Sequence, residues 1–303
     1  MSLLGRVEPA PVDGGLHLDD YYVWGSTVVR GDDGKHHMWA TVWPRTTAKS
    51  FAISPEGGFY GHTTICKAVS DTPEGPYHFE GQVLQPRPGM FDGISCHNPA
   101  VIRYEDQYVL YYCGYDGRKH VGCAVADSPY GPWRRGEASI FPGRTIDANN
   151  PAPCVCPDGS ILVLFRADRM DLHAAKAPSP EGPHEIVAGP LLAEMAEDPF
   201  VWREEGEYRM IVEDSGGAYT GTRVNGALFR SDDGLSWRPA EPVLAYSHPV
   251  ALSDGREIHG RQEKPALLLD DAGRPTHLFL VKAQEVGDDP YHDIWNVCVP
   301  LGR

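Results

Sequence analysis

The sequence predicts an all-β protein, a five-bladed β-propeller with four-stranded antiparallel blades around a central funnel. Three observations lead to this prediction. Gly and Pro contribute 33 and 27 of the 303 residues, so the chain is rich in turn-forming residues. A short phrase occurs five times, and a tight turn follows each copy at a nearly constant distance. Repetition with many short strands is typical of propellers, whose radial arrangement leaves only short, protected edges.

The repeated phrase is a polar or aromatic pair, then a small residue or Pro, then an apolar run. Its five copies lie at residues 24–29, 97–102, 149–153, 197–202 and 263–268. A turn follows the small residue or Pro after eight residues in four copies and after seven in the copy at Pro199. We therefore expect five hairpins with one register. The blades of one propeller domain, spanning residues 1–303, should begin near residues 24, 97, 149, 197 and 263.

Further strands follow each turn. Runs rich in β-branched and aromatic residues lie at 37–43, 108–112, 161–165, 208–212 and 277–281. A third phrase with its own turn, at 68–77, 126–133, 177–184 and 230–237, supplies a third and a fourth strand in four units. The fifth unit lacks this phrase. We expect the N-terminal segment around Leu16 to complete the fifth blade as its outer strand.

Charge and composition exclude several classes of function. Lys and Arg number 27 against 42 Asp and Glu, and a net charge of -15 repels phosphate backbones and anionic lipids. We therefore expect neither nucleic acid nor membrane as a partner. No long apolar run is present and the first residues lack the apolar core of a secretion signal, which predicts a cytoplasmic protein. Cys154 and Cys156 are separated by one residue, so the seven cysteines are expected to be reduced, buried thiols.

In a propeller the inner strand of each blade starts at one rim of the channel, and the second strand returns to that rim. The residues at these positions should therefore surround one funnel, and nearly all of them are polar, charged or aromatic. Rings such as Trp24, Trp43 and Tyr112 offer faces to the C–H surface of sugars, so the funnel is expected to bind a small carbohydrate. Alternatively, these residues only cap the channel. The predicted binding residues are Trp24, Trp43, Arg45, His97, Asn98, Asn149, Asn150, Arg166, Glu213, Arg261 and Lys264.

Two neighbouring carboxyl groups suggest the chemistry. Glycoside hydrolysis needs one protonated carboxyl group and one ionised carboxylate. Glu197 precedes Asp198 directly, and a like charge with partial burial would raise one of the two pKa values. Glu197 is therefore the candidate general acid, although Arg166, Arg261 or Lys264 could oppose this by stabilising the anion.

The order of these motifs resembles a known family. The frame of Asx-Pro, apolar run, Asp-Gly turn, Tyr-rich strand and Ser-Pro-x-Gly-Pro-Trp, from about Tyr21 to Cys298, resembles the propeller glycoside hydrolases of the arabinanase and β-xylosidase type, glycoside hydrolase family 43 and its relatives. The resemblance implies a general base Asp in the first blade, a pKa-modulating Asp before Pro in the third, and a general acid Glu in the fourth. Glu197 matches the acid, whereas Gly25 and Asn150 stand at the other two positions.

A different residue must then supply the base. Glu263, Asp19, Asp20, Asp147 and Glu213 are candidates, and Glu263 and Asp20 are favoured; Asp198 completes the predicted catalytic set with Glu197. No cofactor and no catalytic metal are expected. Relatives sometimes hold a structural cation in the channel through water and a histidine. His97, His248 and His259 could serve here, although a buried, hydrogen-bonded role is favoured for His97.

The sequence therefore predicts an exo-acting glycoside hydrolase for a small plant or algal oligosaccharide. The resemblance implies an inverting mechanism, because the family pattern places water opposite the leaving group. Two alternatives remain: a propeller that binds carbohydrate without cleaving it, and a sugar phosphorylase or lyase that uses the same funnel. Three long segments, 43–62, 83–97 and 246–262, are expected to wall the funnel.

Overall fold

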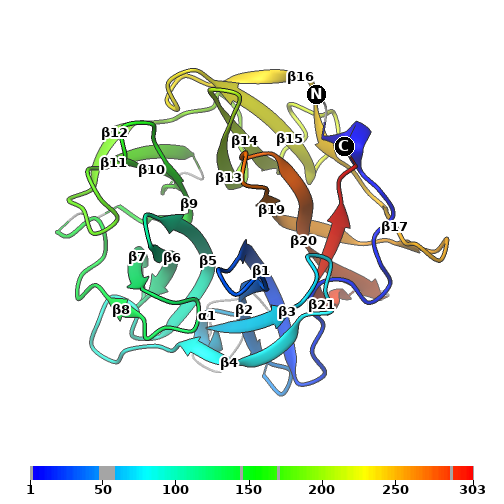
Figure 1. Ribbon diagram of the computed structural model, residues 1–303, viewed down its shortest axis with the longest axis horizontal. Helices are drawn as coiled ribbons and strands as arrows, with labels where there is room; N and C mark the ends of the chain where they lie inside the picture. The colour runs from blue at the N-terminus through cyan, green and yellow to red at the C-terminus, as the bar shows by residue number, and fades with distance from the viewer. Residues whose placement is uncertain (1–2, 48–58, 144–145, 169–170, 287–288, 303) are drawn as a thin grey trace.

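Five antiparallel sheets lie side by side around a central axis (Figure 1), which confirms the predicted five-bladed propeller. The computed structural model describes residues 3–47, 59–143, 146–168, 171–286 and 289–302. Each blade is given from its innermost strand outward. The first blade consists of β1 (Tyr21–Arg30), β2 (His36–Pro44), β3 (Thr64–Ser70) and β4 (His78–Leu84), and the second of β5 (Ser95–Tyr104), β6 (Gln107–Tyr115), β7 (Lys119–Ala126) and β8 (Arg134–Arg135). The third consists of β9 (Asn149–Val155), β10 (Ile161–Arg166), β11 (Leu172–Ala177) and β12 (Glu185–Ala188), the fourth of β13 (Glu197–Glu204), β14 (Glu207–Asp214), β15 (Asn225–Ser231) and β16 (Arg238–Tyr246), and the fifth of β19 (Arg261–Leu269), β20 (Pro275–Val286) and β21 (Asp289–Pro300).

The described part of the chain has few other elements. A 3-10 turn, η1 (Leu4–Arg6), precedes the first blade, and a four-residue helix, α1 (Phe59–His62), lies between β2 and β3. A small hairpin of β17 (Val250–Ala251) and β18 (Glu257–Ile258) precedes the fifth blade. Among the described residues, none of the helices has the length and apolar character required to cross a bilayer.

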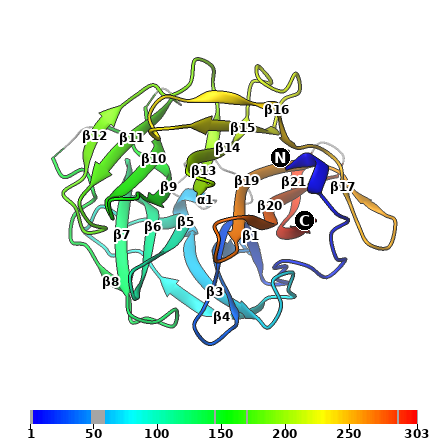
Figure 2. The same cartoon turned by 45° about the horizontal axis from the view of Figure 1, so that its top comes forward.

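The fifth sheet has three strands, and the N-terminal segment covers its outer edge (Figures 1 and 2). Leu16 and Asn296 exchange two backbone hydrogen bonds of 3.1 and 3.0 Å, and the Glu8 N–H donates to the Pro300 carbonyl at 3.0 Å. These contacts are isolated bridges rather than a strand. The N-terminal segment therefore lies where an outer strand was predicted, but the prediction that it forms a strand is wrong. Gly15 permits the close approach, because its φ is 81° and a Cβ there would lie 2.1 Å from the Asn296 carbonyl oxygen.

The hydrophobic core lies between neighbouring blades rather than at one centre. On β10, Val163 and Phe165 pack toward the second blade, whereas Leu162 and Leu164 pack toward the fourth. Both faces of the strand are therefore buried, which explains why each second strand is a continuous apolar run instead of an alternating one. All seven cysteines are free and buried, as predicted. Burial raises the pKa of Cys66 to about 12, so this thiol stays protonated at neutral pH.

A β-bulge interrupts each inner strand at the repeated phrase. In all five blades the pairing with the second strand shifts register there, for example between His97 and Ala100. The residue before each Pro adopts a left-handed backbone, with φ of 50–55° at Asn98, Asn150, Asp198 and Lys264. A bulge re-aims a side chain, and the Pro that follows has no N–H to donate to the ladder. The repeated phrase is therefore the sequence signature of a bulge that turns one residue per blade toward the channel.

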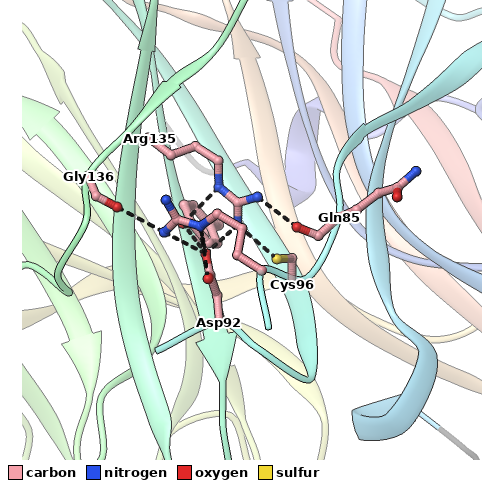
Figure 3. A network of polar contacts seen from close by, with 7 residues as sticks. Gln85, Asp92, Cys96, Arg135 and Gly136 are labelled. Atoms are coloured by element: carbon pink, nitrogen blue, oxygen red, sulfur yellow. Dashed lines mark hydrogen bonds and ion pairs between the residues drawn. The ribbon is translucent and has the colours of Figure 1, made fainter. Parts of the chain in front are cut away.

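A buried ionic network fixes the segment that joins the first two blades (Figure 3). The Asp92 carboxylate is fully buried and accepts hydrogen bonds from Arg87 at 3.0–3.2 Å, from Arg135, and from the Tyr112 hydroxyl at 2.7 Å. Arg87 also donates to the Gly136 carbonyl at 2.8 Å, and Arg135 to the Gln85 carbonyl at 2.6 Å. The network holds residues 85–92 against the second blade. Tyr112 is thus fully buried, and its predicted role as a sugar-stacking ring is wrong.

We expect Asp92→Asn to destabilise the protein by about 3–5 kcal/mol, because it leaves two arginines without their shared buried counter-charge. The measurement is the midpoint of urea unfolding. Asp106→Asn is the matched control, because Asp106 is exposed in the turn between β5 and β6. An unchanged midpoint for Asp92→Asn would contradict the importance of the network.

Candidate active site

Four polar side chains from four blades surround one end of the channel, and three hydrogen bonds join them in a row that is called the ring below. Asn98 Nδ2 donates to Asn150 Oδ1 at 2.7 Å, and Asn150 Nδ2 and Lys264 Nζ both donate to Asp198 Oδ1 at 2.5 Å. These are the left-handed residues of the bulges. The ring ends a channel of ≈ 400 Å³ whose other walls are the inner strands. Asn98, Asn150 and Lys264 were predicted to bind substrate; the structure brings them together here.

The ring explains why two carboxylates of the family pattern are absent. Gly25 occupies the equivalent position of the first blade, and a Cβ there would lie 3.0 Å from Cγ and 3.1 Å from Cδ of Lys264. The stem of a fifth-blade lysine therefore fills the space of the first-blade Asp. In the third blade, Asn150 donates to Asp198 and accepts from Asn98 at the same time. An ionised Asp has no donor and could not make both bonds.

Three buried carboxyl groups converge beside the ring. Oxygen atoms of Asp198, Glu213 and Glu263 lie within 4.8 Å of one another, and the three residues are 6%, 4% and 9% exposed. Glu213 is the direct cross-strand partner of Glu197 on β13 and β14, so a fourth carboxyl group is adjacent. The site opens to solvent, because the side chains of Glu197 and Arg261 are 23% and 39% exposed. Glu197, Asp198 and Glu263 were predicted as catalytic, and they meet in one place.

Three cations neutralise three of these four carboxyl groups. Arg166 forms an ion pair with Glu197, and Lys264 with Asp198. Arg261 Nε donates to Glu263 Oε1 at 2.6 Å. Within the described ranges Glu213 has no ion-pair partner; the Ser215 hydroxyl donates to it at 3.4 Å. Glu213 is therefore the carboxyl group most easily kept neutral.

Burial and mutual repulsion separate the pKa values of these groups. Burial, and then the charges of Glu263, Asp198 and Glu197, raise the pKa of Glu213 to about 9. Burial raises the pKa of Glu263 to about 7, although Arg261 opposes the shift. Burial and the Asp198 charge also raise the pKa of Glu197, against Arg166 and Lys264. At neutral pH the cluster therefore retains a proton on Glu213.

Sequence reasoning missed Tyr246, at the end of β16. This tyrosine is 2% exposed, and burial together with the charges of Glu213, Asp198 and Glu263 raises its pKa well above 10. The ring fits because its cross-strand partner is Gly226, where a Cβ would lie 2.1 Å from the ring. An Ala-Tyr pair at the outer strand of a blade carries no signal for this position, because only the packing of β15 against β16 brings the ring to the carboxylates.

The opposite side of the ring is aromatic and cationic. His97 is fully buried and makes edge contacts with Phe59 and Tyr60, with centroids 5.0 and 5.4 Å away. Burial and the charges of Lys264, Lys119 and Arg166 lower the pKa of His97 well below 6.5, so the imidazole is neutral. Nearby, Asn149 Oδ1 accepts a hydrogen bond from Cys113 Sγ at 2.6 Å. The burial of His97 agrees with the favoured interpretation, whereas among the described residues neither ring nitrogen has a hydrogen bond of ordinary geometry.

Several predicted residues do not join the cluster. Trp24 and Trp43 are 4% and 0% exposed and pack on Phe59, so neither ring presents an open face to a sugar. Arg45 donates to the Leu18 carbonyl at 3.1 Å and to Asp293 at 2.5 Å, and thereby ties the N-terminal segment to β21. Asp20 is exposed before β1, where its backbone carbonyl accepts the Arg45 N–H at 3.0 Å. In the described part of the chain, no polar contact joins Asp20 to the four carboxyl groups.

The possible ligands for the expected channel cation are carboxylate oxygens and histidine nitrogens. The oxygens of Asp198, Glu213 and Glu263 are close enough to surround a cation. However, Lys264 and Arg261 already pair with two of these groups, and the remaining charge is balanced by a proton on Glu213. Of the histidines considered, His248 interacts with Gln262 Nε2 at 3.0 Å, and His259 is mostly exposed beside Glu257. A cation at this site would therefore compete with Lys264 and Arg261 for the carboxylate oxygens.

Comparison with solved structures supports the fold over nearly the whole chain. Zg3597, a family 117 glycoside hydrolase from the marine bacterium Zobellia galactanivorans, is 16% identical, with a TM-score of 0.74 over 98% of this chain and 89% of its own. The catalytic domain of a family 62 α-L-arabinofuranosidase from Coprinopsis cinerea is 13% identical, with a TM-score of 0.67 over 99% and 98%. CoXyl43, a family 43 β-xylosidase/α-arabinofuranosidase from a compost metagenome solved with xylotriose, is 14% identical, with a TM-score of 0.64 over 97% and 95%.

No protein-family profile and no curated sequence matches the chain. At these identities the similarity establishes the architecture, which is the five-bladed propeller that these glycoside hydrolases share.

We expect Asn150→Asp to destabilise the protein by about 2–3 kcal/mol at pH 7, because it removes a buried donor and places a second anion beside Asp198. The repulsion raises the folded-state pKa of the new carboxyl group above the unfolded value of about 3.9. The deficit relative to wild type should therefore shrink as the pH falls through that folded-state pKa. Urea unfolding of the wild-type protein and of Asn150→Asp at pH 7 and pH 4.5 measures this deficit in stability. A deficit that is equal at both values would contradict the ring geometry.

Proposed function

We propose that this protein is a glycoside hydrolase that works with a carboxylic acid and a carboxylate base. One observation carries the proposal: four carboxyl groups converge beside the channel, and burial splits their pKa values so that Glu213 titrates at about 9 and Glu263 at about 7. Pairs of carboxyl groups in such different states are what glycoside cleavage requires. The architecture shared with glycoside hydrolases of three families adds support.

The geometry favours specific roles. The cross-strand pair Glu197 and Glu213 shares one proton, and Glu197, with the more exposed side chain, donates it to the leaving oxygen. Glu263 acts as the base, oriented by Arg261, and is preferred to the exposed Asp20. Asp198 is a positioning residue, because Lys264 and Asn150 fix its carboxylate and its charge raises the pKa of Glu197.

The shape of the site favours removal of terminal sugars. The hydrogen-bonded ring crosses the channel, so a saccharide chain reaches the carboxyl groups from one side only. This arrangement suits a sugar at the end of a small plant or algal oligosaccharide.

The direct test is incubation of the wild-type protein with plant and algal oligosaccharides and aryl glycosides, in the absence of phosphate, with chromatographic analysis of products. Release of single sugars supports the proposal. Turnover that requires added phosphate would instead indicate a phosphorylase, and an unsaturated product a lyase. Binding of oligosaccharides without any turnover would indicate a carbohydrate-binding propeller; each of these three results overturns hydrolysis.

We expect Glu197→Gln to lower kcat/KM about 10²–10⁴-fold on natural oligosaccharides, because the leaving oxygen loses its proton donor. The loss should be much smaller on aryl glycosides with acidic phenols, which depart without protonation. Glu204→Gln, at the other end of β13, is the control and should retain wild-type rates. Equal losses on both kinds of substrate would exclude Glu197 as the acid.

The pH dependence of kcat/KM should be bell-shaped. Activity should rise as Glu263 loses its proton near pH 7, because the base must be ionised. It should fall near pH 9, where the Glu197–Glu213 pair loses the proton that it shares. Initial rates across pH 5 to 10 at constant ionic strength measure both limbs. A rate that is independent of pH between 6 and 8 would contradict this assignment of the base.

A further inference from the structure

Within the described part of the chain, one cation beside the ring, Lys119, has no anion to pair with. Lys119 is the first residue of β7, and its Nζ lies 5.4 Å from the centroid of the Tyr60 ring. Its side chain is partly buried, yet across the ranges that the structure describes no carboxylate lies within ion-pair distance of it. Arg166, Arg261 and Lys264, by contrast, each contact a carboxylate directly. Partial burial of an ammonium group without a counter-charge is unfavourable.

The surroundings of Lys119 are electropositive. Burial and then the Arg166 charge lower the pKa of Lys119, and the more weakly acting carboxylates of Asp147 and Glu197 do not cancel this. Lys119, Arg166 and Lys264 all act on the same neutral histidine, His97. Arg166 and Lys264 are ion-paired with Glu197 and Asp198, so Lys119 is the one of these three cations that has no carboxylate partner among the described residues, in a chain whose net charge is -15.

The two sides of the ring thus differ in charge. The carboxyl groups of Asp198, Glu213 and Glu263 gather at the fourth and fifth blades, where the cations Lys264 and Arg261 already have carboxylate partners. Arg166 connects the sides, because it contacts Glu197 and also acts on Lys119. An anion held near Lys119 would consequently lie close to the carboxyl group that is proposed to protonate the leaving oxygen.

We propose that Lys119 binds the anionic group of an acidic sugar, a carboxylate or a sulfate ester, so that the natural substrate is an anionic oligosaccharide. This substrate class rests on the proposed hydrolase function. The anion site itself can be tested by binding alone, without turnover. An ammonium group that gains a charged hydrogen-bond partner in a partly buried site should contribute about tenfold or more to affinity.

The experiment is isothermal titration of the full chain with D-glucuronate, D-galacturonate and D-mannuronate, the sulfated sugar galactose 6-sulfate, and the corresponding neutral hexoses. Wild-type protein should bind at least one acidic sugar about tenfold more tightly than its neutral counterpart. Preference for the uronates or for the sulfated sugar identifies which anion is recognised. Lys119→Met, which keeps the apolar stem, should abolish the preference without altering affinity for neutral sugars, and Lys119→Arg should restore it. Lys35→Met, in the exposed turn after β1, is the control.

Three results would overturn the proposal: no preference for any acidic sugar in the wild-type protein, an unchanged preference in Lys119→Met, or inorganic phosphate that binds at this lysine and stimulates turnover of neutral glycosides. Loss of the preference in Lys119→Met with intact unfolding behaviour would support it even if no glycoside is cleaved. The anion site and the hydrolase function can therefore fail separately.

Discussion

A β-bulge near the start of each inner strand brings one residue per blade to the axis and so sets the geometry of the site. An inner strand in regular pairing would alternate its side chains between the two neighbouring blades. The register shift and the left-handed residue before Pro release one side chain per blade from that alternation. Five such positions meet on the axis, and the side chains of the four that are not glycine become hydrogen-bond partners. The ring of Asn98, Asn150, Asp198 and Lys264, closed over Gly25, is the direct result.

The ring also determines the charge of the site. Lys264 reaches Asp198 from the next blade and fills the first-blade position, so no carboxylate can stand there. Negative charge is concentrated instead at the fourth and fifth blades, where Glu213 and Glu263 lie beside Asp198. Three cations then face four carboxyl groups, and burial makes a proton on Glu213 the most favourable way to balance them. The blades that supply the carboxyl groups therefore differ from those of the family pattern. The arrangement of the strands is the same.

Charge is also separated across the ring. Aromatic residues of α1 cover His97 and Lys119 on one side, and buried carboxyl groups occupy the other. His97 is neutral and adds no positive charge of its own, and the charges of Lys264, Lys119 and Arg166 help to lower its pKa. A chain with a net charge of -15 can in this way place cations next to four carboxyl groups.

The sequence by itself determined the architecture and the convergence of Glu197, Asp198 and Glu263, because the repeat is a local pattern and radial symmetry brings equivalent positions of every blade to the axis. It also indicated that the chain start lies along the fifth blade. Tertiary structure decided which side chains are accessible and which are charged. Trp24, Trp43 and Tyr112 occupy rim positions in the repeat, yet their rings turn into the spaces between blades. Tyr246 and Lys119 reach the site from positions outside the repeated phrase. Burial, and with it the pKa of Glu213, depends on contacts between blades that are distant in sequence, and no local pattern encodes those contacts.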